Sequence, residues 1–169
     1  MSGCRSQTRR SRLSSMHSPK HYHGWTLLEL IAVIAISSVL ATVAYGSYSS
    51  AIERARTSRA IGDIAKIHAA IEKYRLNNND DLPLSLEEIG QDIDDPWGEP
   101  YAYLNFGTLP GKSKGPVRKD HNLVPLNSRY DLYSKGPDKQ SRSPLTAKAS
   151  RDDIIMANDG AYIGLAEDY

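Results

Sequence analysis

One hydrophobic run with a single charge constrains this chain more than any other feature. From Trp25 to Ala44 the sequence reads WTLLELIAVIAISSVLATVA, and its only ionisable side chain is Glu29. A helix of about 20 residues is roughly 30 Å long, close to the hydrocarbon thickness of a bilayer. A carboxylate inside such a segment costs about 2.5–3.5 kcal/mol, so it needs a partner or a function. The run therefore predicts a membrane helix whose one acidic side chain has a partner or a function.

The charges that flank this run indicate its orientation. Residues 1–24 contain several basic side chains and no acid: Arg5, Arg9, Arg10, Arg12 and Lys20. A basic flank favours retention on the cytoplasmic side, which leaves the rest of the chain exported. Without residues 1–24 the chain is net acidic, which argues against electrostatic binding of nucleic acid. We expect no nucleic-acid partner.

The helical pattern continues beyond the hydrophobic run. Apolar residues recur three and four positions apart, on one face: Ala60, Ile64, Ile67, Ile71 and Tyr74. The opposite face carries Arg59, Asp63, Lys66 and Lys73. We expect one helix from about Trp25 to about Leu76, with residues 25–44 in the membrane and residues 45–76 packed on a globular domain. At the junction, Gly46 is either a place where the helix kinks or locally melts on assembly, or a simply tolerated glycine.

Residues 77–169 are predicted to form a small globular head. Ser85 and Glu88 have the spacing of a capping box, which predicts a short helix to about Gly90. Residues 101–105, 129–134 and 161–165 read as antiparallel strands. The expected fold class is α+β: a long N-terminal helix, membrane-spanning in its first half and amphipathic in its second, packed on a small antiparallel sheet.

Residues 107–125 are predicted to form a loop, because they are rich in glycine, proline and basic residues. The basic side chains of this loop are Lys112, Lys114, Arg118 and Lys119. Two interpretations are open for them: they are solvated, or they contact DNA.

The chain lacks the motifs of a catalytic or disulfide-stapled domain. Cys4 is the only cysteine, so no intramolecular disulfide can form, and a structural metal is the other common staple of a small exported domain. There is no phosphate-binding glycine loop, no zinc-spaced Cys/His set and no G-x-S-x-G motif. We therefore predict that the protein is not an enzyme, with an anchored hydrolase as the alternative.

Residues 24–30, GWTLLEL, resemble the G-F-T-L-x-E-L signature of type IV pilins and pseudopilins, with Trp25 in place of the usual phenylalanine. The resemblance implies that residues 1–24 are a basic leader and that prepilin peptidase cuts after Gly24 and methylates the new amino terminus at Trp25. It also implies that Glu29 pairs with the terminal amine of a neighbouring subunit during assembly. The leader is long for this family, and Met16 offers an alternative start.

A narrower resemblance lies in the head. DPWGEPY at residues 95–101, and DLYSKGPD at residues 131–138 followed by DDI, resemble the major pseudopilin of type II secretion systems. That family binds calcium, and the resemblance implies four ligand residues here: Lys135, through its carbonyl, Asp138, Asp152 and Asp153. Oxygen donors of this kind are what calcium prefers. Two departures are a longer segment between Asp138 and Asp152, and Lys139 in place of a glycine.

The resemblance implies a structural subunit of a type II secretion pseudopilus, processed by prepilin peptidase and polymerised through its N-terminal helix. Its implied partners are further copies of itself, minor pseudopilins, prepilin peptidase and the inner-membrane assembly platform. Its implied location is the bacterial inner membrane, as a single-pass protein with the C-terminal domain in the periplasm. The alternatives are a type IV pilus subunit for adhesion, motility or DNA uptake, and a membrane-anchored calcium-binding module that does not polymerise.

Overall fold

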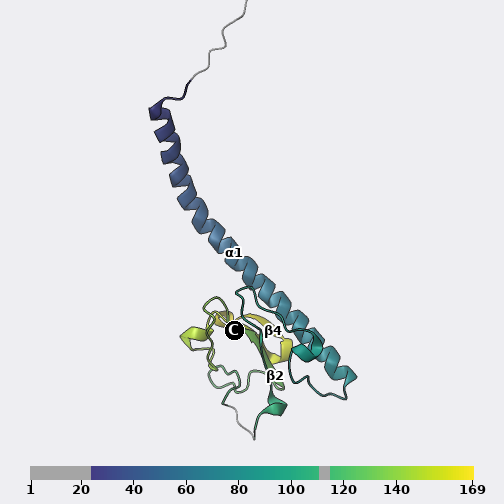
Figure 1. Cartoon of the computed structure of the whole chain (residues 1–169). Coiled ribbons are helices and arrows are strands. Elements are labelled where there is room, and N and C mark those ends of the chain that lie inside the picture. The colour runs from purple at the N-terminus through teal and green to yellow at the C-terminus, as the bar shows by residue number, and fades with distance from the viewer. Residues whose placement is uncertain (1–23, 111–114) are drawn as a thin grey trace, which may run out of the picture. The chain divides into compact units, whose positions relative to one another are not determined.

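The computed structural model describes residues 24–110 and 115–169. Residues 1–23 of the predicted leader, with the alternative start at Met16, lie outside the described residues, as do Lys112 and Lys114. The chain divides into two compact units, Met1–Val43 and Ala44–Tyr169. Helix α1 begins at Leu27 in the first unit and ends at Asn77 in the second, close to the bounds expected from the sequence (Figure 1).

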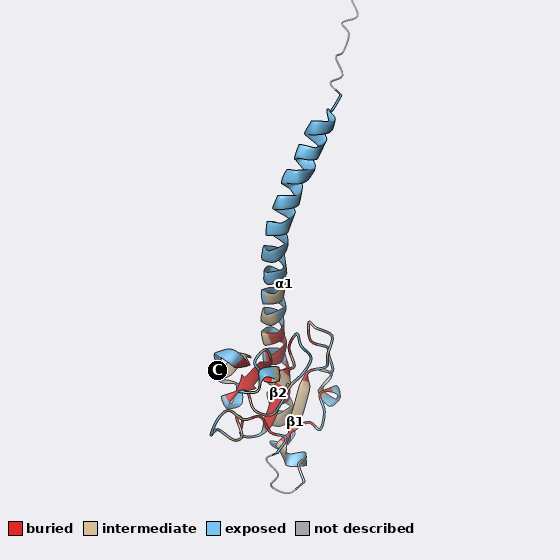
Figure 2. Cartoon of the chain, turned by 90° about the vertical axis from the view of Figure 1, so that its left-hand side faces the viewer, coloured by how far each residue is buried: buried red, intermediate tan, exposed pale blue. Residues whose placement is uncertain are grey.

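In the first unit, every described side chain is exposed (Figure 2). Among the described residues, α1 is the one helix long and apolar enough to cross a membrane. Its hydroxyl groups bond within the helix: Ser38 Oγ donates to the Ile34 carbonyl and Thr42 Oγ1 to the Val39 carbonyl, both at 2.7 Å. Internal hydrogen bonds of this kind suit a segment surrounded by hydrocarbon, where no water can satisfy a polar group.

Helix α1 continues through Gly46 without a break. The carbonyl of Gly46 accepts hydrogen bonds from the hydroxyls of Ser49 at 3.0 Å and Ser50 at 3.1 Å. Gly46 is thus an ordinary helical residue in the single chain, and kinking or local melting at this position on assembly stays a prediction.

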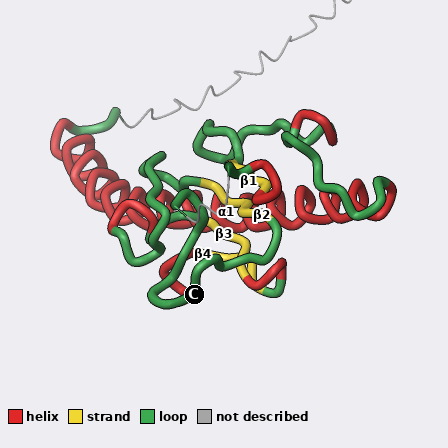
Figure 3. Tube along the Cα trace, turned by 90° about the horizontal axis from the view of Figure 1, so that it is seen from below, coloured by secondary structure: helices red, strands yellow, loops and turns green. Residues whose placement is uncertain are grey.

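The second unit contains a four-stranded antiparallel sheet in the order β1-β2-β3-β4, within the described residues (Figure 3). The strands are β1 Ala102–Asn105, β2 Tyr130–Ser134, β3 Ile154–Ala157 and β4 Tyr162–Leu165. Short 3-10 turns cover Glu87–Ile89, Phe106–Thr108, Lys148–Ser150, Asn158–Gly160 and Ala166–Asp168. Strand β1 pairs with β2 over four residues, whereas β2 and β3 share only the pairs Tyr133–Ile155 and Ser134–Ile154.

The main core lies between α1 and the sheet. The predicted apolar stripe is confirmed, because Ala60, Ile64, Ile67 and Ile71 are all fully buried. They belong to one cluster with Leu86, Tyr101, Tyr130, Leu132, Ile154 and Met156. A second cluster contains Leu126, Leu145, Ile155, Ala157 and Ala166. The α+β expectation is therefore confirmed, and the head is built around one face of α1.

Strand β3 was not predicted, and the sheet has four strands where three were expected. Ile154 and Met156 belong to the cluster under α1, whereas Ile155 and Ala157 belong to the second cluster. Because successive side chains of a strand point to opposite faces, β3 is buried on both sides and has no polar alternation.

Two side chains differ from their predicted roles. The short helix that ends at Gly90 is present as the 3-10 helix Glu87–Ile89, but Ser85 does not cap it, and Glu88 Oε2 accepts the backbone N–H of Leu84 at 2.8 Å instead. Asp63 was placed on the solvated face of α1 but is buried. Its carboxylate accepts a hydrogen bond from the hydroxyl of Tyr101 at 3.4 Å, and Tyr101 covers it.

Truncating the buried stripe should unfold the head far more readily than truncating the exposed surface of α1. Ile67→Ala should lower the free energy of unfolding by about 2–5 kcal/mol, because the side chain is 0% exposed and its loss leaves a cavity. The matched control is Leu76→Ala on the same helix, where the side chain is 77% exposed and the change should stay within about 0.5 kcal/mol. Urea denaturation of the full chain in detergent measures both. Equal losses would contradict the assigned core.

The turn after β2 depends on Gly136. Its φ is +67°, and a Cβ built there would collide with the backbone carbonyl of Asp152. Gly98 also has positive φ, +82°, but the atom nearest to its built Cβ is Lys139 Nζ at 4.0 Å. Gly136→Ala should therefore lower the melting temperature more than Gly98→Ala, since both lose about 1 kcal/mol of backbone preference and only Gly136 also loses its contact with the Asp152 backbone. The same loss in both variants would show that the close approach is unimportant.

Candidate functional site

The predicted processing residues lie just before α1. Gly24 and Trp25 are exposed and precede the first helical residue, Leu27. A Cβ built on Gly24 would meet no atom within 4 Å, and its φ is not in the left-handed region. Nothing in the described structure therefore requires glycine at position 24.

Glu29 is held at the start of α1 by a reciprocal pair of hydrogen bonds. The Glu29 N–H donates to Thr26 Oγ1 at 3.2 Å, and the Thr26 N–H donates to Glu29 Oε2 at 3.5 Å. This is a capping box, in which two unpaired N–H groups of a helix start are satisfied together. The carboxylate also lies where the helix dipole favours a negative charge. Sequence analysis missed the role of Thr26, although the T-x-x-E spacing is a recognisable signal.

Most described side chains around Glu29 in the first unit are apolar and exposed. Exposed large apolar side chains in this unit are Trp25, Leu27, Leu28, Leu30, Ile31, Val33, Ile34, Ile36, Val39, Leu40 and Val43. A helix that is apolar all round needs lipid or other helices around it. The first unit therefore supports a membrane anchor and an assembly surface.

The predicted calcium ligands flank the loop between β2 and β3. Lys135 follows β2, and Asp152 and Asp153 precede β3. The structure brings Asp138 and Asp152 together, because the Asp138 N–H donates to Asp152 Oδ2 at 3.2 Å. Asp138 Oδ1 accepts the N–H of Gln140 at 2.8 Å, so this carboxylate also caps its own turn.

The carboxylate of Asp153 is engaged by other side chains and is therefore not a free ligand. Its Oδ2 lies 2.5 Å from Nη2 of Arg118 and accepts a hydrogen bond from Ser141 Oγ at 2.6 Å. Burial raises the pKa of Asp153 to about 6, while the charge of Arg118 and the hydrogen bond from Ser141 oppose that rise. The carboxylate is thus already paired with a cation from the chain.

As folded, this donor set does not fit a calcium ion. Calcium takes six to eight oxygen ligands, so the oxygens of this loop would have to converge on one point. Among residues 24–110 and 115–169, no three His, Cys, Asp or Glu side chains are grouped to hold a metal. Calcium binding by Lys135, Asp138, Asp152 and Asp153 stays a prediction.

Arg118 is the residue of this region that sequence analysis missed. It was assigned to a loop that is either solvated or in contact with DNA, but its side chain is 3% exposed, so both interpretations are wrong for it. Its partner Asp153 is 35 residues away along the chain. No local spacing signals such a pair, because the contact exists only once the sheet has formed.

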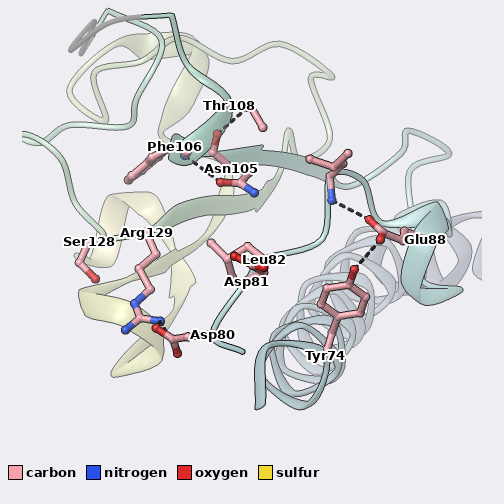
Figure 4. A pocket seen from close by; sticks show the side chains of 12 residues that line it. Tyr74, Asp80, Asp81, Leu82, Glu88, Asn105, Phe106, Thr108, Ser128 and Arg129 are labelled. Atoms are coloured by element: carbon pink, nitrogen blue, oxygen red, sulfur yellow. Dashed lines mark hydrogen bonds and ion pairs between the residues drawn. The ribbon is translucent and has the colours of Figure 1, made fainter. Parts of the chain in front are cut away.

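A hollow of about 790 Å³ lies beside the end of α1 (Figure 4). The Tyr74 hydroxyl donates to Glu88 Oε1 at 2.5 Å, which raises the pKa of Tyr74. Arg129 lies 3.2 Å from Asp80 Oδ2, and its hydrogen bond lowers the pKa of Asp80. The described residues that line the hollow include no histidine, cysteine or lysine. Asp80 and Arg129 pair with each other, and Glu88 accepts hydrogen bonds from the Tyr74 hydroxyl and the Leu84 N–H.

Comparison with known proteins adds independent findings. A family model for the prokaryotic N-terminal methylation motif matches residues 19–45. The chain is 30% identical to type II secretion system core protein G of Escherichia coli (strain K12), over 73% of this chain and 87% of the relative. The proteins of the same name from Pseudomonas aeruginosa and Aeromonas hydrophila are 30% and 31% identical, over 68% and 70% of this chain and 83% and 85% of the relatives. No solved structure matches the chain significantly.

The matched motif includes Gly24, Trp25 and Glu29, and the similarity to the relatives extends over most of their length. The resemblance inferred from the sequence is therefore confirmed: the chain belongs to the family of type II secretion system core protein G, the major pseudopilins.

Proposed function

We propose that this chain is processed by prepilin peptidase and assembles into a periplasmic pseudopilus of a type II secretion system through its N-terminal helix. The observation that carries the proposal is the apolar, fully exposed start of α1, whose one acid lies in the first helical turn. Such a surface is unstable in water and needs a membrane before assembly and neighbouring subunits after it.

Cleavage after Gly24 would turn the exposed Trp25 into the new amino terminus, which the same peptidase methylates. The new amine would then lie two residues before the first residue of α1. An amine and a carboxylate near the same helix start are each costly in an apolar environment, and pairing them offsets much of that cost.

Assembly would exchange the partner of Glu29. In the single chain, Oε2 accepts only the long 3.5 Å hydrogen bond from Thr26. Giving up a weak, exposed cap for a neighbouring subunit's charged amine loses little and gains a charge-assisted contact. The pairing selects the register between subunits more than it adds stability, because desolvation cancels much of the Coulomb attraction.

The proposed partners are further copies of this chain, minor pseudopilins, prepilin peptidase and the inner-membrane assembly platform. In this proposal the anchor spans the bacterial inner membrane once, with the head in the periplasm, since the basic residues precede the apolar run. The subunit acts by assembly and disassembly and catalyses no reaction, in keeping with a family of structural proteins. Nucleic acid is not among the proposed partners.

Glycine at position 24 should matter to the peptidase and not to the fold. Gly24→Val should leave the precursor uncleaved while the head melts at the unchanged temperature, because a side chain at residue 24 meets nothing. The matched control is Gly46→Ala, where a Cβ also meets no atom within 4 Å and cleavage should continue. Intact-protein mass spectrometry of membranes from cells with an active peptidase reads out both. Cleavage of the valine variant at the same bond would refute the assigned site.

The charge of Glu29 should be needed for assembly but not for cleavage. Glu29→Gln can keep the reciprocal hydrogen bonds with Thr26, because glutamine also serves in a capping box, yet it leaves a neighbour's amine without a counter-charge. Both Glu29→Gln and Glu29→Ala should be cleaved normally and form few filaments, as measured by shearing and by cross-linking. If glutamine restores filaments and alanine does not, the cap and not the charge is what assembly requires.

A further inference from the structure

The buried ion pair in the head connects segments that are far apart in the sequence. Nη2 of Arg118 lies 2.5 Å from Asp153 Oδ2, and Nη1 donates to the Arg142 carbonyl at 2.8 Å and to the hydroxyl of Ser141. The guanidinium carbon lies 4.3 Å from the ring centroid of Tyr133. Arg118 therefore joins the loop before β2, strand β2 itself and the segment that leads into β3.

The ion pair of Arg118 and Asp153 matters for stability because it is buried. The side chains of Arg118 and Asp153 are 3% and 0% exposed. Each charge alone would be costly in such a place, so each depends on the other. The ring of Tyr133 adds a cation–π contact to a desolvated guanidinium.

Two orphaned atoms belong to the same pair. Within the described part of the chain, the only buried side-chain atoms without a hydrogen-bond partner are Arg118 Nε and Asp153 Oδ1. An arginine and a carboxylate commonly pair through two parallel hydrogen bonds, of which only the one from Nη2 to Oδ2 is formed here. The unused carboxylate oxygen and the unused Nε donor therefore belong to the same buried ion pair.

The lengthened segment after Asp138 supplies the other partners of the guanidinium. Ser141 and Arg142 both lie in this segment, which departs from the family pattern. Ser150 closes it, because its Oγ accepts the Arg142 N–H at 2.7 Å and donates to the Arg142 carbonyl at 2.8 Å. The segment after Asp138 and the buried arginine are therefore linked by hydrogen bonds.

The two other candidate carboxylates are engaged by the loop itself. Asp152 accepts the backbone N–H of Asp138, and Asp138 accepts that of Gln140. A calcium ion bound to Asp153 would lie beside the guanidinium, and two positive charges at such a distance in a dry interior repel strongly.

We infer that the guanidinium of Arg118 is the built-in cation of the loop between β2 and β3, in place of the calcium ion that the family resemblance implies. It neutralises Asp153, fixes Ser141 and Arg142, and holds the entry to β3. The head is therefore stable without a divalent cation.

The first test compares the melting temperature of the unmodified full chain in detergent, with excess calcium chloride and with excess chelator. The melting temperature should be the same in both, because a ligand that does not bind the folded state adds no stability. A rise of several degrees with calcium, reversed by chelator, would overturn the inference and support calcium binding at Asp138, Asp152 and Asp153.

The second test removes the cation from the chain. Arg118→Met keeps an apolar stem but leaves Asp153 buried without its counter-charge, and should lower the melting temperature by roughly 10 °C. The control Arg129→Met removes an exposed arginine whose side chain is 44% exposed and which pairs with Asp80. That variant should change the melting temperature by about 2 °C or less. An equally small change in Arg118→Met would count against the inference.

A double-mutant cycle isolates the pair. Arg118→Met with Asp153→Asn should be more stable than the two separate losses predict when added, because no buried charge is then left alone. Strict additivity would show that the two groups are not coupled. If Arg118→Met does not fold, recovery of folding in the double variant gives the same evidence, and the calcium and chelator comparison on the unmodified chain decides independently of any variant.

Discussion

Burial of one face of α1 against the sheet is the interaction on which the rest of the head depends. Ile64, Ile67 and Ile71 are fully buried there, and each such side chain contributes about 1.5–3 kcal/mol relative to exposure. The sheet could not hold together alone, since its central strands β2 and β3 share only two residue pairs. The face of α1 that begins at Ala60 is therefore committed to the head. The described residues before Ala60 are exposed, apart from the half-buried Glu53 and Thr57, and are left for lipid or other subunits.

The elements that carry a periodic signal were predictable, and those fixed by distant contacts were not. The isoleucine stripe of α1 and the strand-like stretches of β1, β2 and β4 were visible because each pattern is local. Strand β3 has four apolar residues in succession, and a short uniform run carries no period that separates a strand from a buried turn. Asp63 lies on the charged side of the helical wheel but is covered by Tyr101, which follows it by 38 residues. The processing and assembly residues were found from a motif, whereas Arg118 depends on a partner that only the folded sheet brings near.

Glu29 combines a local role with an intermolecular one. In the single chain it closes a capping box with Thr26, which satisfies N–H groups that no preceding helical turn can reach. This position keeps the carboxylate at the end of α1 where cleavage creates an amine. The cap therefore keeps the acid at this helix start until a neighbouring subunit's amine replaces the long hydrogen bond from Thr26.

Stabilisation by a cationic side chain does not depend on the concentration of a free ion, whereas stabilisation by a bound metal does. Stabilisation by a metal grows with its free concentration, since only the folded state binds it, whereas a buried arginine is present at any concentration. The cost is desolvation of two charges, which the Coulomb attraction repays only when further hydrogen bonds are made. Ser141 and the Arg142 carbonyl provide those bonds. The segment between Asp138 and Asp152 thus supplies what an internal ion pair needs.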